Sequence, residues 1–205
     1  MSKVHSKTNY HHGNLRQSLV EQASKMLNEG GVESLSMRKL AEAVGVSRTA
    51  LYHHFADKNA LLCAVTEQGF TRWREEAERI FARDDISAHE KVRQFVRDYI
   101  YYAADNPQLY ELMFGRTIWK NANPTDSLKA VAYPSFQQQV DMTRHWQAIG
   151  IMPASEDTLR LAQVTWGTMH GIARLLIDGI YADRSHIDEM CDCAMHLFTS
   201  RTNSV

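Results

Sequence analysis

The sequence predicts an all-α protein with about nine helices. Apolar residues recur at spacings of three and four along most of its 205 residues, which is the repeat of a helix with an apolar face. Residues that start or stop helices interrupt this pattern at intervals. No alternating apolar run is long enough to predict a pair of strands.

Four helices are expected in the N-terminal part, and their boundaries follow from capping chemistry. Ser and Asp side chains accept hydrogen bonds from the free N–H groups of a first turn, whereas Gly adopts the positive φ angle that ends a helix. The third helix should end near His54. The boundary residues are Gly30 and Gly31 at the end of the first helix, Ser36 and Gly45 at the two ends of the second, Ser47 at the start of the third and Asp57 at the start of the fourth.

Five further helices are expected beyond residue 82. A serine three residues before a glutamate forms a capping box, and proline is favoured in a first turn because its missing N–H needs no partner there. The expected starts are Ser87, with Glu90, for a helix to about Ala104; Pro107; Pro124 for a segment that ends at Gly150; residue 155 for a helix to about 180; and Ser185.

Composition excludes several classes of protein. With 44% hydrophobic residues and a net charge of −1, the chain is unlike disordered proteins. No apolar run approaches the roughly 18 residues of a membrane helix, and the polar start lacks the apolar core of a signal peptide. We therefore expect a soluble cytoplasmic protein without a membrane partner, in which Cys63, Cys191 and Cys193 stay reduced.

Charge is unevenly distributed along the chain. Residues 1–60 hold eight Lys or Arg and five Asp or Glu, a net charge of +3, whereas the remaining 15 basic and 19 acidic residues give −4. A basic N-terminal part on an acidic body favours an anionic partner for that part.

Residues 34–58 follow the pattern of a helix-turn-helix, with a turn centred on Gly45. In such a unit the N-terminal residues of the second helix face base edges in the major groove of DNA. Ser36 can present its hydroxyl and nearby N–H groups to a phosphate, and Lys58 can add a further phosphate contact. The residues expected to contact DNA are Ser36, Met37, Arg38, Ser47, Arg48, Thr49, Tyr52, His53, His54 and Lys58.

Three segments closely resemble the TetR family of bacterial transcriptional regulators. The lead-in to them, Tyr10-His-His-Gly-Asn-Leu-Arg16, is similar as well, so the resemblance covers residues 10 to about 62. It implies a homodimer with a three-helix DNA-binding head, residues 1–57, and a larger all-α domain, residues 58–205, that holds an inducer pocket and the dimer interface. The three segments are Leu35-Ser-Met-Arg-Lys-Leu-Ala-Glu-Ala-Val-Gly-Val-Ser47, Leu51-Tyr-His-His-Phe55 and Asp57-Lys58-x-x-Leu61.

The resemblance also implies roles within the head. Tyr52 and Lys58 match phosphate-contacting positions of the family. The positions that face the groove are matched by Ser47, Arg48, Thr49 and His53. Residues 1–9 are either an arm to the minor groove or a frayed tail, and we expect the tail.

A second resemblance lies in the body of the chain. Trp166-Gly-Thr-Met-His170-Gly171, preceded by Asn106-Pro-Gln-Leu-Tyr-Glu-Leu-Met-Phe114, is similar to the C-terminal domain type named for a Trp-His-Gly motif. Three residues separate Trp166 from His170 here, which departs from that motif. This resemblance implies an architecture and no particular ligand.

The body also concentrates aromatic and methionine side chains between residues 99 and 170. Such adaptable apolar groups line pockets for hydrophobic or aromatic ligands, although most of them are expected to be core. His170 is either the polar anchor of a ligand or a core histidine bonded to backbone. The residues expected to contact an effector are Met113, Phe114, Trp119, Trp166 and His170.

The helix expected at 155–180 is apolar on two faces, so both faces must be covered. Gly167 and Gly171 would permit the close approach of another helix. We expect homodimerisation through this helix and the last one; the alternative is a fully buried central helix in a monomer.

These patterns predict a ligand-responsive DNA-binding regulator, a repressor released from a palindromic operator when its effector binds. The alternatives are a DNA-scaffolded protein-interaction factor, an inducer-independent regulator of the same fold, and an activator. No catalytic motif is found, so the chain is expected to be no enzyme and to need no cofactor. His11-His12 and His53-His54 lack the spacing and further ligands of a metal site.

Overall fold

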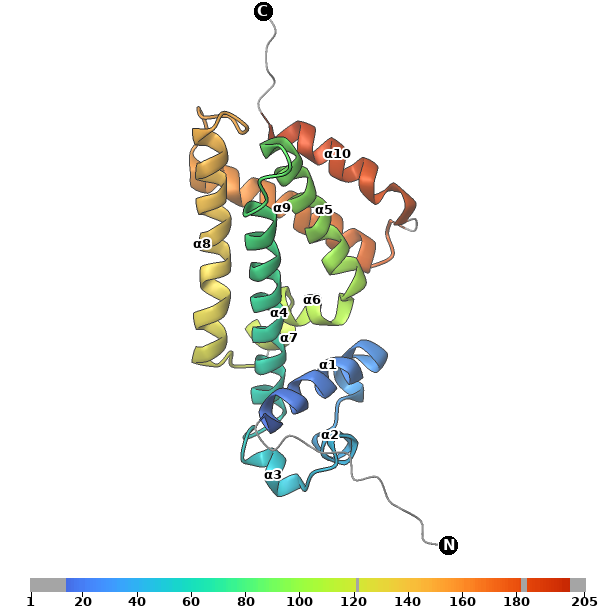
Figure 1. Cartoon of the computed structure of the whole chain (residues 1–205). Coiled ribbons are helices and arrows are strands. Elements are labelled where there is room, and N and C mark those ends of the chain that lie inside the picture. Colours follow the sequence, from blue (N-terminus) through green and yellow to red (C-terminus); the bar gives the residue numbers. More distant parts are fainter. Residues whose placement is uncertain (1–13, 121, 182–183, 200–205) are drawn as a thin grey trace, which may run out of the picture.

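The computed structural model describes residues 14–120, 122–181 and 184–199, which form helices and the turns between them (Figure 1). The nine expected helices are present in this part of the chain, with a further four-residue helix, α7, and a short 3-10 helix, so the all-α prediction is confirmed. Residues 1–9 and His11-His12 lie outside the described residues. The α-helices are α1 (Leu15–Ser34), α2 (Met37–Val44), α3 (Arg48–Tyr52), α4 (Lys58–Phe81), α5 (Ala88–Asp105), α6 (Pro107–Phe114), α7 (Arg116–Trp119), α8 (Asp126–Ala148), α9 (Thr158–Ile177) and α10 (Ile187–Phe198).

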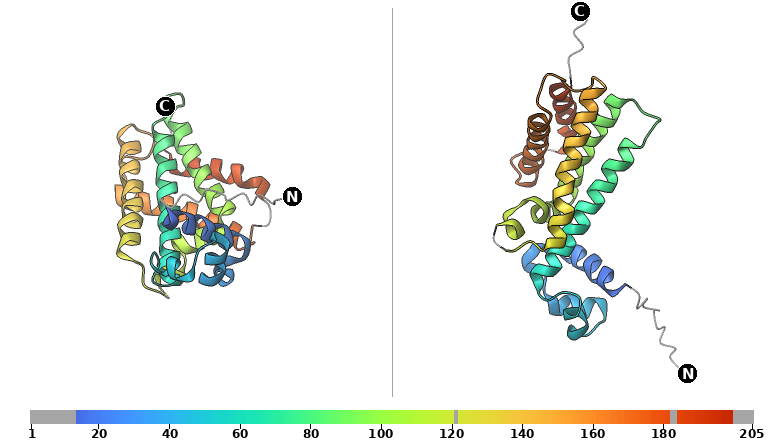
Figure 2. Two further views of the ribbon diagram at one scale, coloured as in Figure 1. Left: turned by 60° about the horizontal axis from the view of Figure 1, so that its bottom comes forward. Right: turned by 90° about the vertical axis from the view of Figure 1, so that its left-hand side faces the viewer.

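Helices α1, α2 and α3 form a head at one end of the molecule (Figures 1 and 2). α2 packs on both α1 and α3, and α1 packs on the start of α4. The predicted N-caps of α2, α3 and α4 are present, because Ser36, Ser47 and Asp57 each accept a hydrogen bond from a backbone N–H three residues later. Local capping chemistry therefore sets where the three helices begin.

The long helix α4 leaves the head and runs through the body (Figure 2). α8 and α5 pack against α4, α9 packs against α5 and α8, and α10 lies on α5. Arg93 and Arg97 of α5 form ion pairs with α10 at 2.5 and 2.8 Å. The buried apolar side chains of the head and of the body form one continuous cluster, so no layer of polar groups separates the two.

Several helix boundaries differ from those expected. α8 begins after Thr125, whose hydroxyl accepts the hydrogen bond from Leu128 N at 3.2 Å, and not at Pro124. α9 begins after Asp157, which caps Arg160 N at 3.0 Å. The last helix follows a 3-10 turn, Arg184–His186, and has no side-chain cap. In α8 and α9 a better hydrogen-bond acceptor stands one or two residues beyond the expected start.

The first helix does not stop at its paired glycines. It continues to Ser34, but Gly31 interrupts it with φ 68° and ψ −176°. This backbone conformation is open essentially to glycine alone, so the predicted break is present as a kink. Ser34 stabilises the kink because the single proton of its hydroxyl is shared between the Gly31 and Met26 carbonyls, at 2.8 and 3.1 Å.

None of the described helices is long and apolar enough to cross a membrane. Cys63 and Cys191 are buried and Cys193 is exposed, and all three are free thiols. Within the described residues, no three His, Cys, Asp or Glu side chains come together as metal ligands would.

Candidate DNA-binding head and ligand pocket

Helix α3 presents one polar face because its apolar side chains are buried. Leu51 is fully buried and Phe55, just beyond the helix, is 2% exposed, so the two anchor α3 in the head. Ser47 starts the helix by accepting a hydrogen bond from Ala50 N at 3.1 Å. The exposed side chains of this segment are Ser47, Arg48, Thr49, Tyr52, His53 and His54, all of them expected DNA contacts.

The turn between α2 and α3 is held by backbone hydrogen bonds. Gly45 has φ 77°, a left-handed conformation that glycine adopts readily. The N–H groups of Gly45 and Val46 donate to the carbonyls of Glu42 and Ala41 at 3.1 and 2.9 Å. α3 therefore projects from α2 in a defined direction, as a recognition helix requires.

The expected contacts at the start of α2 differ in accessibility. Ser36 is half-buried, and its hydroxyl accepts from Lys39 N at 3.5 Å. Arg38 is exposed and pairs with Glu42 at 3.5 Å, whereas Met37 packs against the core. Arg38 is the residue of this set that is most free to reach a phosphate.

Lys58 already has a partner inside the protein. Its Nζ donates a hydrogen bond to the Val32 carbonyl at 2.6 Å, and the side chain is half-buried. This bond ties the end of α1 to the start of α4. A phosphate contact by Lys58 would compete with it, so the phosphate role stays a prediction.

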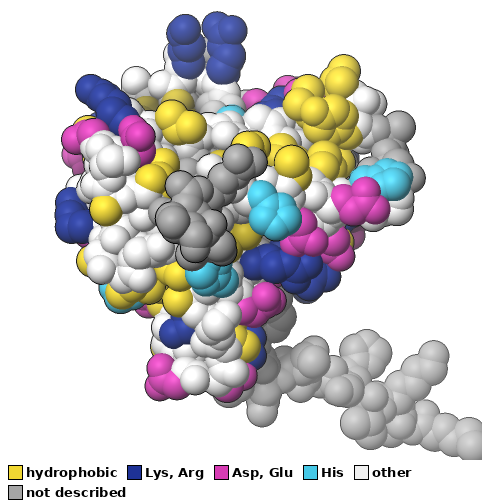
Figure 3. All heavy atoms as spheres, turned by 90° about the horizontal axis from the view of Figure 1, so that it is seen from above, with side chains coloured by type: hydrophobic (Ala, Val, Ile, Leu, Met, Phe, Trp, Pro, Cys, Tyr) yellow, Lys and Arg dark blue, Asp and Glu magenta, His cyan; other side chains and the backbone are white. Residues whose placement is uncertain are grey.

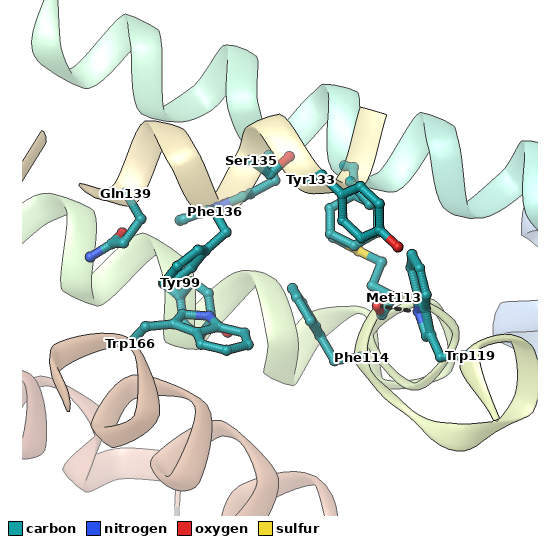
Figure 4. A pocket seen from close by; sticks show the side chains of 12 residues that line it. Tyr99, Met113, Phe114, Trp119, Tyr133, Ser135, Phe136, Gln139 and Trp166 are labelled. Carbon is teal, nitrogen blue, oxygen red and sulfur yellow. Dashed lines mark hydrogen bonds between the residues drawn. The ribbon is translucent and has the colours of Figure 1, made fainter. Parts of the chain in front are cut away.

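A cavity of about 280 Å³ lies in the body, among α4 to α9 (Figure 4). Four of the five expected effector contacts line this cavity: Met113, Phe114, Trp119 and Trp166. The other lining residues are Phe70, Trp73, Tyr99, Ala132, Tyr133, Ser135, Phe136 and Gln139. The wall is thus largely aromatic, which suits an apolar ligand.

The two indole N–H groups of Trp119 and Trp166 are bonded to protein acceptors. Trp119 Nε1 donates to the Met113 carbonyl at 2.8 Å, drawn as a dashed line in Figure 4. Trp166 Nε1 donates to the Tyr99 hydroxyl at 3.0 Å. Both side chains therefore offer ring carbon to the cavity.

His170, the fifth expected contact, does not line the cavity. It lies behind the wall, packed against the rings of Phe114 and Trp166. Its Nδ1 is 2.6 Å from the Tyr110 hydroxyl, which is itself 2.7 Å from the Tyr99 hydroxyl. Its hydrogen-bond partner among the described residues is therefore a tyrosine side chain rather than the backbone, and its role as an effector contact stays a prediction.

Burial controls ionisation in this hydrogen-bond chain. It raises the pKa of both Tyr99 and Tyr110 far above that of an exposed phenol, so both remain protonated. Burial, and then the nearby Arg174 charge, lower the pKa of His170. The neutral imidazole is therefore favoured at neutral pH, and its Nδ1 can accept from Tyr110.

Two family models match the chain. Residues 19–65 match the bacterial regulatory proteins of the tetR family, and residues 92–198, more than half of the chain, match the tetracyclin repressor-like C-terminal domain. The chain belongs to the TetR family. It is thus a DNA-binding transcriptional regulator and no enzyme, as predicted from its motifs. The Trp-His-Gly subtype stays a prediction.

Individual relatives agree with this assignment. The class C tetracycline repressor of Escherichia coli is 45% identical over 56 residues, which are 27% of this chain and 26% of that protein. The repressor AcnR of Corynebacterium efficiens is 40% identical over 62 residues, 30% of this chain and 33% of that protein. These alignments thus span about a quarter to a third of the curated relatives. A solved structure of a protein of unknown function from Rhodococcus sp. RHA1 is 32% identical, covers 94% of this chain and 97% of that one, and has a TM-score of 0.80.

Sequence reasoning missed the cavity-lining face of α8 in this TetR-family chain. Ala132, Ser135, Phe136 and Gln139 line the cavity at the spacing of one helical face. The spacing is a detectable signal, but two of the four residues are polar, so a search for apolar stripes passes over them.

Helix α6 belongs to both the pocket and the contact with the head. Its end supplies Met113 and Phe114 to the cavity wall, and its body packs against α1. A Cβ atom on Gly31 of α1 would lie 3.1 Å from Gln108 Oε1 of α6. Helix α6 therefore contacts both the cavity and the head.

Proposed function

We propose that this TetR-family regulator is a ligand-responsive repressor, which leaves a palindromic operator when a small, mainly hydrophobic or aromatic effector binds in the body. The observation that carries the proposal is the shared helix α6, which walls an apolar cavity and packs on the DNA-binding head. An inducer-independent regulator would need no such cavity.

The operator-binding form is proposed to be a homodimer joined through α9 and α10. Val164 on α9 is 63% exposed and Leu197 on α10 is 74% exposed, and an uncovered apolar surface of this kind is typical of an interface. A Cβ atom on Gly167 or Gly171 would meet nothing within 4 Å, which leaves room for another helix. Hydrophobic side chains also lie uncovered among charged ones at the end of the body that carries α10 (Figure 3).

In this mechanism the two α3 helices enter successive major grooves, whose centres are about 34–36 Å apart. Effector in the cavity moves α6 and α4, and the two heads no longer match that spacing. DNA and effector then weaken each other's binding by equal free energies, typically about 1–3 kcal/mol.

Selection of random DNA duplexes by the purified protein tests the proposal. The wild type should enrich one palindromic motif, and an Arg48→Ala/Tyr52→Ala variant should enrich none. Arg144→Ala serves as a matched control, because Arg144 is an exposed arginine on α8 paired with Asp141, near the end of α8 remote from the head (Figure 1). The same motif with the α3 variant would refute the assigned contacts. Enrichment of many unrelated sequences would favour the protein-interaction alternative.

A further inference from the structure

The cavity wall carries no charge that could neutralise an ionised ligand. The described residues that line it are aromatic or otherwise uncharged. An ionised group that enters such a site loses its hydration without gaining a partner of opposite charge, which is costly. The wall therefore selects against carboxylates and similar anions.

Most polar groups of the wall already have partners. The indole N–H groups of Trp119 and Trp166 are bonded within the protein, and Tyr99 lies between Trp166 and Tyr110 in the hydrogen-bond chain. Ser135 donates its hydroxyl proton to the Val131 carbonyl at 3.1 Å, and its oxygen can still accept. A ligand has little to gain from these groups beyond ring contact.

Tyr133 and Gln139 are the exceptions. Tyr133 is 65% exposed, so its hydroxyl stays hydrated at the surface. Gln139 is 7% exposed and lines the cavity, and its side chain has no hydrogen-bond partner among the described residues. Its amide N and O keep contact with solvent, so a ligand that pairs with them replaces water and gains the usual net worth of a hydrogen bond. Figure 4 shows Gln139 at one end of the labelled side chains and Trp119 at the other, with Phe136, Trp166 and Phe114 between them.

We infer that the cavity takes an uncharged, largely aromatic molecule with an amide-like donor and acceptor that pair with the side-chain amide of Gln139. Its ring system lies between Phe114, Phe136 and Trp166, toward Trp119. This ligand class rests on the effector site of the proposed function. It makes the proposed function more specific, because the effector must carry a polar group at the Gln139 end of the cavity and no charge.

An aromatic cation is the strongest competing class of ligand. Aromatic faces attract ammonium groups, and several aromatic side chains line this cavity. No acidic side chain accompanies them among the described lining residues, so a bound cation would keep an uncompensated charge. A probe of this class is therefore included in the test.

Equilibrium dialysis against four probes that share one ring system tests the inference. The probes are naphthalene, 2-naphthamide, 2-naphthoate and protonated 2-naphthylmethylamine. The proteins are the wild type, Gln139→Leu and the matched control Gln137→Leu. Gln137 is an exposed glutamine of the same helix that bonds to Asp141 and does not line the cavity. Thermal unfolding of each variant verifies that it is folded.

The wild type should bind 2-naphthamide roughly tenfold or more tightly than either charged probe, because ions lose hydration on entry. Gln139→Leu should weaken amide binding relative to naphthalene binding by about three- to tenfold, the usual worth of a hydrogen bond. Gln137→Leu should change neither.

Three results would overturn the inference: naphthoate or the ammonium probe binding as tightly as the amide, no binding of the amide, or the same amide-to-naphthalene ratio in Gln139→Leu as in the wild type. Because dialysis is done without DNA, these failures concern the ligand class alone. Failure of the proposed function would appear separately, in the selection of DNA duplexes.

Discussion

A hydrogen-bond chain with one favoured direction of donation links four side chains: Trp166, Tyr99, Tyr110 and His170. The indole can only donate, and a neutral imidazole with its proton on Nε2 can accept at Nδ1. Tyr99 therefore donates to Tyr110, and Tyr110 donates to His170, across the observed 2.7 and 2.6 Å distances. The Tyr99 hydroxyl then accepts one hydrogen bond and donates one, and the Tyr110 hydroxyl does the same. These bonds fix the orientation of both tyrosine side chains behind the cavity wall.

Tyr110→Phe should destabilise the protein. Tyr110 is 1% exposed, and loss of its hydroxyl leaves Tyr99 without an acceptor and His170 without a donor. We expect a loss of about 1–3 kcal/mol in the free energy of unfolding, measured with urea. Tyr133→Phe is the matched control because Tyr133 is 65% exposed. Equal stability of the two variants would show that the buried chain contributes nothing.

Stability should also fall at mildly acidic pH through His170. The folded state lowers the pKa of this imidazole from 6.5, first by burial and then through Arg174, while Glu111 opposes the shift. The unfolded chain therefore binds more protons as the pH falls below about 6.5, and the free energy of unfolding decreases there. His170→Phe should reduce this decrease between pH 7.5 and 5.5. An identical pH profile in the variant would exclude His170 as its source.

At the residue scale, sequence alone predicts side chains that act on their own neighbours. Ser36, Ser47 and Asp57 cap helices through bonds three residues away, so local sequence suffices. His170 was expected either to anchor the effector or to bond to backbone, but its partner Tyr110 lies 60 positions earlier. Such a pairing depends on how α6 and α9 pack, which periodicity does not reveal.

At the scale of elements, the junction between head and body depends on the kink in α1. Gly31 turns the end of α1 beside α6, and Lys58 of α4 bonds to the Val32 carbonyl in the same segment. The paired glycines predicted a helix end here. Sequence could not show that a further turn follows or that α6 packs on it, because both depend on tertiary contacts.

Gly31→Ala should destabilise this junction. A residue with a Cβ atom is strained at φ 68° and ψ −176°, at a cost of about 1–3 kcal/mol, and its Cβ would press on Gln108 Oε1 at 3.1 Å. Urea unfolding measures the loss. Adding Gln108→Ala to the Gly31→Ala variant removes the contact but leaves the backbone strain. The stability that it restores therefore measures the contact alone. A variant as stable as the wild type would mean that the kink relaxes freely.

The starts of helices show the same limit of prediction. Pro124 and Thr125 are adjacent candidates for the start of α8, and Ser155 and Asp157 compete for the start of α9. Each candidate is chemically suitable. In the structure Thr125 and Asp157 supply the capping acceptors, and helix boundaries are uncertain by a residue or two when several such candidates stand together.

At the scale of the whole molecule, head and body share one apolar cluster. Close-packed interiors transmit displacement because they have little free volume. This continuity supports a regulator in which a cavity in the body controls the head. The all-α class was predictable, since it depends on the period of the sequence, and so was the aromatic content of the body, since it depends on composition.

Val164→Glu should convert the proposed dimer to monomers, because it places a charge on the exposed apolar face of α9. Operator affinity should fall on the order of a hundredfold, since two linked heads bind far more tightly than one. Light scattering after size-exclusion chromatography reports the mass. Ile149→Glu is the control, because Ile149 is 47% exposed at the end of α8. Dimers that persist in Val164→Glu would place the interface elsewhere.

The central claim, that the cavity and the head are coupled, is tested most directly by a thermodynamic cycle. The affinity for the selected operator duplex is measured with and without saturating 2-naphthamide, and the affinity for 2-naphthamide is measured with and without the duplex. The account predicts that each ligand weakens the other by the same factor, about 5- to 150-fold. Equal affinity of the probe for the free and the operator-bound protein would contradict it.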